Sequence, residues 1–243
     1  MRFNGVDLLS LHPAISIAKE IPPGMPEREL RTVARRQGEK IAGVNIKRSD
    51  YVVRVNIAAK TWEEAWALRA MVAQWATSSG GKTAELEPTH WPQVVYDAIA
   101  AIIDPPEFVF HQGVMEVTFA LPDGYAREQI PRIAHGNGSA TMEIGGSAET
   151  APMITYTLSA DAKNLEMTLD DKTFFALKDL KAGDVVVIDM TKEAGRVTIN
   201  GVDSLDRIDY TKTDWLPGFA PGLHTLAASA AGTLEVRWHN RWA

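Results

Sequence analysis

Two short stretches of the chain combine residue types that nucleotide-binding and acyl-transfer sites use. Gly80-Gly81-Lys82-Thr83 is similar to the end of a phosphate-binding loop, whose backbone amides and lysine hold phosphates. That loop needs an earlier glycine where Ala76 stands, and it follows a strand, whereas this stretch follows a predicted helix. Gly146-Ser147-Ala148 lacks a flanking glycine of the serine-nucleophile turn, because Glu149 occupies that position. We therefore expect neither a phosphate-binding loop nor a serine nucleophile.

Metal-ligating residue types are present without the spacing that a metal site needs. Asp203, Asp206 and Asp209 recur at every third residue, whereas an EF-type calcium loop places its carboxylates at every second position. The six histidines are scattered, and none forms the paired spacing of a zinc hydrolase: His12, His90, His111, His135, His224 and His239. The chain has no cysteine, which excludes thiolate ligands and thiol nucleophiles. We therefore expect no cofactor, no metal and no enzymatic activity.

The composition is that of an ordinary globular protein. The 243 residues include 25 Lys and Arg against 31 Asp and Glu, which gives a net charge of −6, and 45% of the residues are hydrophobic. This length fits one large or two small domains. A net acidic chain argues against nucleic-acid binding, which needs cations. The N-terminus lacks the apolar region of a signal peptide, and the longest apolar run, 98–103, is too short to span a bilayer. We expect a soluble chain that folds in the cytoplasm.

One segment has a helical period. Thr61 and Glu64 form a capping box, and Gly80-Gly81 is a typical helix stop, so we predict a helix over about 62–78. Its Trp-rich face is expected to point into the core. That face consists of Trp62, Ala65, Trp66, Arg69, Val72 and Ala76.

Most of the remaining chain alternates with the period of β-strands. Tyr51, Val53, Val55 and Ile57 share one face of a predicted strand, a second strand contains 115–119, and 93–103 is a longer apolar strand. Beyond residue 130 the strand signals become short and evenly spaced, as in a β-sandwich. The predicted strands there are 141–144, 153–158, 165–169, 173–177, 185–190, 196–199, 223–227 and 233–238. We interpret the Gly- and Pro-rich stretch 122–138, including Gly136-Asn137-Gly138, as the linker between two domains.

Charge is unevenly distributed along the chain. Segment 27–50 carries seven cations against four anions, so it is net +3, and the remainder carries −9. The cations are Arg28, Arg31, Arg35, Arg36, Lys40, Lys47 and Arg48. One interpretation is a solvated loop, and the other is an arm that docks on an acidic neighbour, because complementary potentials guide interfaces.

The order of these elements resembles the distal tail protein (Dit) family of long-tailed, non-contractile bacteriophages over nearly the whole chain. The N-terminal part of the resemblance comprises Phe3-Asn4-Gly5, the basic segment, Tyr51 with its strand, the helix and two long strands. The more specific part lies in the C-terminal half: 180–189 as a Gly-Asp-strand-Asp element, 197–201, Asp214-Trp215-Leu216, the Pro-Gly turn of 221–226, and the aromatic, Arg-bearing end 236–242.

The resemblance implies a mainly β fold of two domains. Residues 1–128 would be a β-rich domain with the helix at about 62–78 and a protruding arm at about 24–50, and six copies would form a ring. Residues 129–243 would contain the linker and a galectin-like β-sandwich. The implied role is structural, in the virion, at the tail tip or baseplate of a phage, prophage or phage-like particle, after synthesis in the host bacterial cytoplasm. The implied partners are the tail tube protein, a tail-tip hub or tail-associated lysin-like protein, and receptor-binding proteins, with no membrane.

A second hypothesis is a carbohydrate-binding module that contacts the host surface. Trp238, His239, Asn240, Arg241 and Trp242 are residue types of sugar sites. Galectin-type sites, however, place their His, Asn and Arg two residues apart on one strand face, whereas these residues are consecutive and must alternate faces. The spacing therefore favours the structural role.

Overall fold

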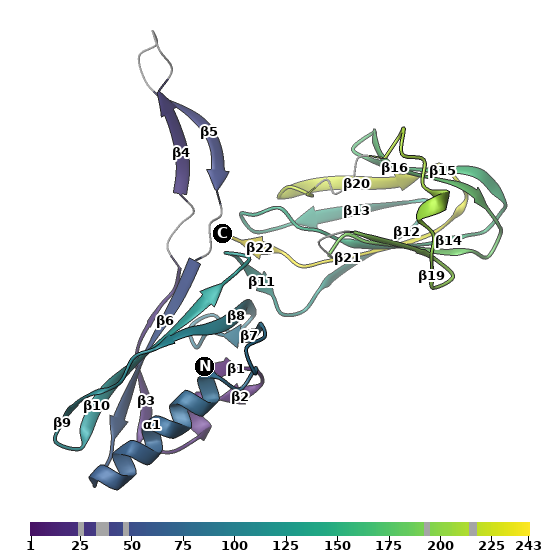
Figure 1. Ribbon diagram of the computed structural model, residues 1–243. Helices are drawn as coiled ribbons and strands as arrows, with labels where there is room; N and C mark the ends of the chain where they lie inside the picture. Colours follow the sequence, from purple (N-terminus) through teal and green to yellow (C-terminus); the bar gives the residue numbers. More distant parts are fainter. Residues whose placement is uncertain (24–26, 33–38, 46–48, 192–194, 214–217) are drawn as a thin grey trace. The chain divides into compact units, whose positions relative to one another are not determined.

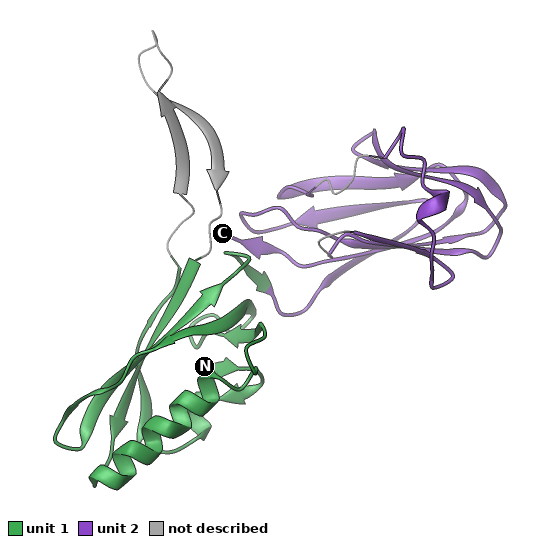
Figure 2. Cartoon of the chain, viewed as in Figure 1, with its two compact units in different colours: residues 1–127, 243 green, residues 128–242 purple. Residues whose placement is uncertain are grey.

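The computed structural model (Figure 1) describes the chain except residues 24–26, 33–38, 46–48, 192–194 and 214–217. It consists of two compact units, coloured separately in Figure 2. Unit 1 contains residues 1–127 with Ala243, and unit 2 contains residues 128–242.

Unit 1 is built on an antiparallel sheet whose strand order is β2-β1-β7-β8-β10-β6-β3, with β9 paired to β10 and β11 to β8. Its core strand β6 buries Tyr51, Val53, Val55 and Ile57, as the alternation predicts. The elements are β1 (Arg2–Phe3), β2 (Val6–Asp7), η1 (Leu8–Ser10), β3 (Ile15–Ile21), β6 (Ser49–Ala58), α1 (Trp62–Ala76), β7 (Ala84–Glu87), β8 (Val94–Ile103), β9 (Glu107–Val109), β10 (Gln112–Leu121) and β11 (Ala126–Glu128).

Helix α1 packs on this sheet against β6, β8 and β10. The Thr61 hydroxyl accepts a hydrogen bond from the Glu64 amide, which satisfies one amide of the first turn, and the Glu64 carboxylate accepts one from the amide of Lys60, just before the N-cap residue. The helix ends at Ala76, two residues earlier than expected: the Ser78 amide donates to the Trp75 carbonyl, three residues back, so the four-residue helical pattern stops after Thr77.

The expected buried face of α1 was wrong in part. Ala65, Val72 and Ala76 are buried, but Trp62 and Trp66 are 45% and 54% exposed. The buried stripe instead continues through Leu68 and Trp75. Trp75 packs edge-on against Phe3 and Phe119, and its indole donates to the Val6 carbonyl at 2.9 Å. Trp75 thus buries its ring and still finds a hydrogen-bond partner for its indole, as buried tryptophans usually do.

The basic segment contains a separate two-stranded antiparallel sheet, formed by β4 (Glu27–Thr32) and β5 (Glu39–Asn45). The register shifts once, between Glu29 and Leu30. The return strand β6 begins at Ser49, so the last two residues of the expected arm belong to the unit 1 sheet.

Unit 2 is a β-sandwich of two antiparallel sheets, with orders β12-β21-β14-β17-β18-β19 and β13-β20-β15-β16. One core cluster joins them, and Tyr156, Met167, Phe219 and Leu226 are fully buried in it. The elements are β12 (Arg132–Asn137), β13 (Ser139–Ile144), β14 (Met153–Leu158), β15 (Ala162–Leu169), β16 (Lys172–Leu180), β17 (Val185–Asp189), β18 (Arg196–Ile199), β19 (Val202–Asp203), η2 (Leu205–Arg207), β20 (Gly222–Ala228), β21 (Gly232–Trp238) and β22 (Arg241–Trp242). The expected fold class, mainly β with one helix among the described residues, is confirmed.

The stretch interpreted as a linker contains a strand instead. Residues 132–137 form β12, which pairs with β21 along its whole length. Gly136 and Gly138 are not linker residues, because they serve the tight turn from β12 into β13. A Cβ on Gly136 would lie 1.6 Å from the Ser139 carbonyl oxygen, and Gly138 has a φ of +73°. The strand went unrecognised because its glycine-containing sequence lacks alternation of large apolar residues.

We predict that Trp75→Ala lowers the free energy of unfolding by about 3–5 kcal/mol, because it removes a buried aromatic side chain and leaves the Val6 carbonyl unpaired. The matched variant Trp66→Ala, on the exposed side of the same helix, should cost under about 1 kcal/mol. Urea unfolding followed by tryptophan fluorescence and circular dichroism measures both. Equal losses for the two variants would contradict this assignment of the core.

Candidate interaction surfaces

The predicted arm residues divide between described strands and undescribed segments. Arg28 and Arg31 lie on β4, and Lys40 lies on β5. Arg35, Arg36, Lys47 and Arg48 lie outside the described residues, as does Asp214-Trp215-Leu216. The inter-subunit role proposed for the seven cations therefore stays a prediction.

The register of the arm places Arg31 directly opposite Lys40 in the antiparallel ladder of β4 and β5.

The residues of the carbohydrate hypothesis are engaged inside unit 2. Trp238 and Asn240 are only 5% and 3% exposed. The Asn240 side-chain oxygen accepts from the Gly145 amide at 2.8 Å and from the Trp238 indole at 3.2 Å, and the His239 ring pairs with the Glu128 carbonyl. These side chains hold the chain end against the turn at Gly145, so the Trp238 ring is not available for a sugar to stack on.

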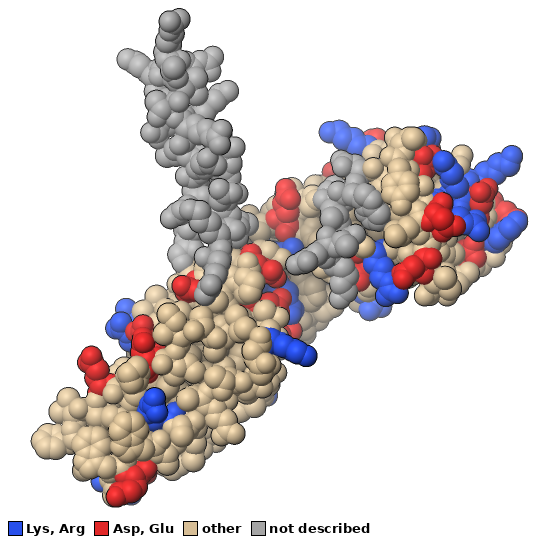
Figure 3. Space-filling view, in the orientation of Figure 1, with Lys and Arg blue, Asp and Glu red and all other residues tan. Residues whose placement is uncertain are grey.

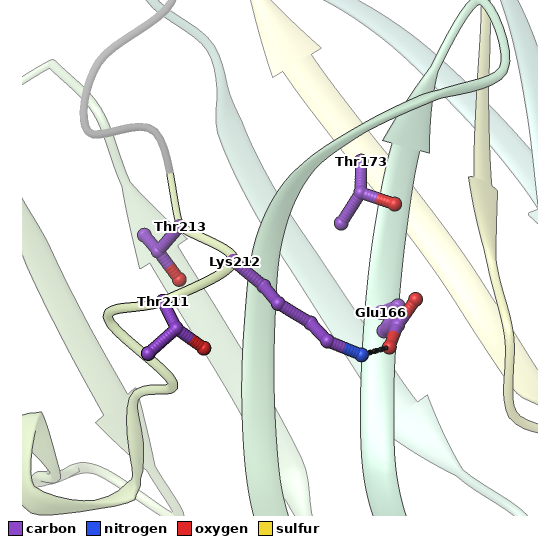
Figure 4. A pocket seen from close by; sticks show the side chains of 5 residues that line it. All are labelled: Glu166, Thr173, Thr211, Lys212 and Thr213. Atoms are coloured by element: carbon purple, nitrogen blue, oxygen red, sulfur yellow. Dashed lines mark hydrogen bonds and ion pairs between the residues drawn. The ribbon is translucent and has the colours of Figure 1, made fainter.

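A polar groove of about 520 Å³ lies on unit 2 (Figure 4). Glu166 and Thr173 come from the neighbouring strands β15 and β16, and Thr211, Lys212 and Thr213 come from the loop after η2. The Lys212 ammonium forms an ion pair with the Glu166 carboxylate across the groove. Because these charges neutralise each other, the lining has hydroxyl groups but no net charge with which to attract an ionic ligand.

Asp209 holds the loop that forms one side of this groove. Its carboxylate accepts from the Thr211 amide and hydroxyl and forms an ion pair with Lys178 at 3.1 Å. These hydrogen bonds, with the hydroxyl of Thr211 the largest cause, lower the pKa of Asp209 to about 2. The Thr213 hydroxyl then ties the loop to β16 by accepting from the Ala176 amide. Asp209 thus has a structural role, because it holds this loop in place.

His224 joins two loops of unit 2. Its ring nitrogens lie 2.7 Å from the Asp170 carboxylate and 2.8 Å from the Ala220 carbonyl oxygen. Both neighbours are acceptors, so only the doubly protonated ring can donate to both. The hydrogen bond to Asp170 raises the pKa of His224, while hydrogen bonds from the Thr225 amide and His224 lower the pKa of Asp170. Asp170 lies at a left-handed turn position, with a φ of +50°.

Sequence reasoning did not find the groove or the His224 clamp. Each combines residues from segments more than forty positions apart, such as Glu166 with Lys212 and Asp170 with His224. Across the described ranges, no three His, Asp or Glu side chains gather as a metal site would require. Nor does any helix in that part of the chain have the length and apolar character needed to cross a membrane.

Comparison with known proteins gives a consistent result. Residues 145–242 match the family described as siphovirus-type tail component, C-terminal domain. The resemblance to the Dit family is confirmed. The crystal structure of SPP1 Dit (gp 19.1), described as a paradigm of hub adsorption apparatus in phages that infect Gram-positive bacteria, has the same fold. Its TM-score is 0.78 at 16% identity, covering 100% of this chain and 98% of that chain.

Two structures of the phage p2 baseplate in its activated conformation are also similar. The strontium form has a TM-score of 0.50 and the calcium form 0.51, each at 10% identity with 93% of this chain and 90% of that chain covered. No curated protein matches the sequence. The chain is therefore Dit-like in fold over its whole length, and most of its C-terminal unit has the sequence features of a siphovirus-type tail component.

We predict that the stability of unit 2 falls as the pH rises above the ordinary histidine pKa of 6.5. A raised pKa in the folded state contributes stability that is complete below the unfolded value and is lost as the pH rises through the folded value. The stability difference between the wild type and His224→Gln should therefore shrink from about pH 6 to about pH 9. Urea unfolding across this range measures it. Asp170→Asn should weaken this pH dependence, and a difference that stayed constant or grew would contradict the clamp.

Proposed function

We propose that this protein is a structural component of the tail tip of a long-tailed bacteriophage or prophage, and that six copies form a ring between the tail tube and the tip. Other baseplate proteins would dock on that ring: the tail tube protein on one side, a tail-tip hub or lysin-like protein on the other, and receptor-binding proteins at its periphery. The protein would reside in the virion and catalyse no reaction.

The observation that carries the proposal is the near-complete mutual coverage with SPP1 Dit. Both units and their order in the chain correspond, so the likeness is not that of one common sandwich domain. The family match of residues 145–242 adds sequence support in the unit where the fold alone is least specific.

The charge distribution supports assembly through unlike surfaces. A cyclic ring uses heterologous contacts, in which one patch meets a different patch on the next copy, and closure of the ring ends growth. A segment of net +3 on a chain that otherwise carries −9 supplies two unlike surfaces. Complementary potentials would then set the orientation of neighbouring copies.

Two observations in the described part of unit 2 count against the carbohydrate alternative. Trp238 and Asn240 are buried, and the described polar groove is lined by a neutralised ion pair and threonines. A glycan array on the purified protein tests this alternative, and we expect no binding.

We predict that reversing Arg35 and Arg36 to Glu weakens ring assembly and makes it less tolerant of salt, because the arm loses its positive potential. Native mass spectrometry and sizing over a salt series measure the ring population. The control is Lys163→Glu with Lys172→Glu, which makes the same change in net charge on exposed positions of unit 2. Rings that persist equally in both double variants would contradict the role of the arm.

A further inference from the structure

A group of large apolar side chains lies exposed at one end of unit 1. Trp62 and Trp66 are 45% and 54% exposed on the first turns of α1, and Val109 and Phe110 are 73% and 80% exposed at the tip of the β9–β10 hairpin. Phe108 joins the two parts, because its ring meets those of Trp62 and Trp66 at centroid distances of 5.8 and 5.9 Å. We call these five residues the hairpin-helix surface. Exposed apolar groups of this kind mark interfaces, and Trp is enriched among their binding hot spots.

The local backbone that holds this surface in place is strained at Phe110 and closely packed at Gly113. Phe110 has a φ of +60°, a conformation that bulky residues rarely adopt. Its side chain is exposed, so burial in the core does not compensate for this backbone strain. A Cβ on Gly113 would lie 2.5 Å from the Phe108 ring, so the glycine is what lets Phe108 lie over β10 beneath the two tryptophans. Backbone strain of this kind clusters at functional sites, so a strained Phe110 with an exposed ring indicates a role in binding rather than in stabilising the fold.

The polar atoms around the surface are incompletely satisfied. His111 lies under Trp62 at a centroid distance of 5.4 Å, and its Nδ1 is buried without a hydrogen-bond partner. Arg69 lies over the Trp66 ring at 5.6 Å, and its Nε is likewise buried and unpaired.

The strand register places this surface and the arm at opposite ends of unit 1. The arm leaves after Ile21 and returns at Ser49, and Ile21 pairs with Val52 near the start of β6. The other end of β6, Ala58, pairs with Gln112, immediately beside the hairpin tip. Ten strand residues separate the two ends, which corresponds to roughly 30 Å. One copy therefore presents two unlike surfaces facing opposite ends of its sheet, as a head-to-tail contact requires.

Charge favours the arm as the occupant. The segments around the surface, 60–69 and 104–112, hold two cations against four carboxylates: Lys60 and Arg69 against Glu63, Glu64, Asp104 and Glu107. The arm segment has the opposite excess, with seven cations against four anions. Indole faces attract guanidinium groups, as Arg69 over Trp66 already shows within one chain. In Figure 3 the visible face of unit 1 has a broad uncharged area between scattered charges.

We propose that the hairpin-helix surface binds the basic arm of a second copy of this chain, and that this contact links successive copies in the ring. The inference rests on the proposed function, because it specifies which surfaces form the contact between subunits. It assigns the anchoring role to Trp62, Trp66 and Phe110, and the role of support to Phe108 and Gly113.

The first test is Phe110→Asn. Asparagine accepts a positive φ, so the variant should be as thermally stable as the wild type or more stable, while its self-association weakens at least about tenfold. The matched control is Ile130→Asn, at a side chain that is 78% exposed on unit 2 and should leave the ring unchanged. Native mass spectrometry over a concentration series measures association, and calorimetry measures stability.

The second test identifies the occupant. A photo-crosslinking amino acid replaces Trp66 in a mixture of isotope-labelled and unlabelled chains, and crosslinked peptides are mapped by mass spectrometry. Crosslinks of mixed isotope composition between position 66 and residues 27–50 support the proposal. Crosslinks within one chain only, or to another region of the neighbour, overturn it.

The outcomes separate this inference from the proposed function. If Phe110→Asn forms the ring as well as the wild type does, the role of the hairpin-helix surface is contradicted, but the proposal of a ring is not. A wild-type protein that stays monomeric at low salt and high concentration contradicts both. If Phe110→Asn and Ile130→Asn weaken association equally, the effect is a non-specific loss of apolar surface. That result also contradicts the proposed role of the hairpin-helix surface.

Discussion

Strand β6 is the constraint on which unit 1 depends. Its alternate residues from Tyr51 to Ile57 are fully or almost fully buried, and it pairs along its length with β10 on one side and β3 on the other. Because a paired strand cannot slip by one residue without moving its apolar side chains into solvent, its register is fixed. The two ends of β6 therefore hold the base of the arm and the β9–β10 hairpin a set distance apart. The proposed contacts between copies would need this kind of rigid spacing.

Unit 2 shows how the sandwich turns are kept in shape by single carboxylates. The Asp184 carboxylate accepts from the Lys181 amide and the Asn200 side chain, and Asn200 in turn accepts from the Val185 amide. This network joins the turn at Ala182-Gly183 to the turn at Asn200-Gly201. It gives a physical reason for the Gly-Asp-strand-Asp and Asn-Gly elements on which the resemblance rests, since a change at Asp184 would release amides from both turns.

Sequence reasoning succeeded where a residue's type fixes the local backbone. The capping box at Thr61 and Glu64 set the start of α1, and the strands Met153–Leu158 and Arg196–Ile199 agree with their predicted bounds, because alternation and turn residues act over a few positions. It was wrong at β12, where glycines serve a close approach between chain segments rather than flexibility. The helix face was also misassigned in part, because the stripe that packs on the sheet runs through Leu68 and Trp75 rather than through Trp62 and Trp66.

The amino-acid sequence by itself determined the mainly β class, the position of the helix, the uneven charge and the resemblance to tail proteins. These properties follow from short-range patterns and from composition. The tertiary structure alone decided that Trp238 and Asn240 are buried, that Asp170 meets His224, and that Trp62, Trp66 and Phe110 gather at one exposed end of unit 1. Such groupings depend on which strands pair and on which side of the sheet the helix lies, and these choices are set by the burial of the whole core rather than by any local segment.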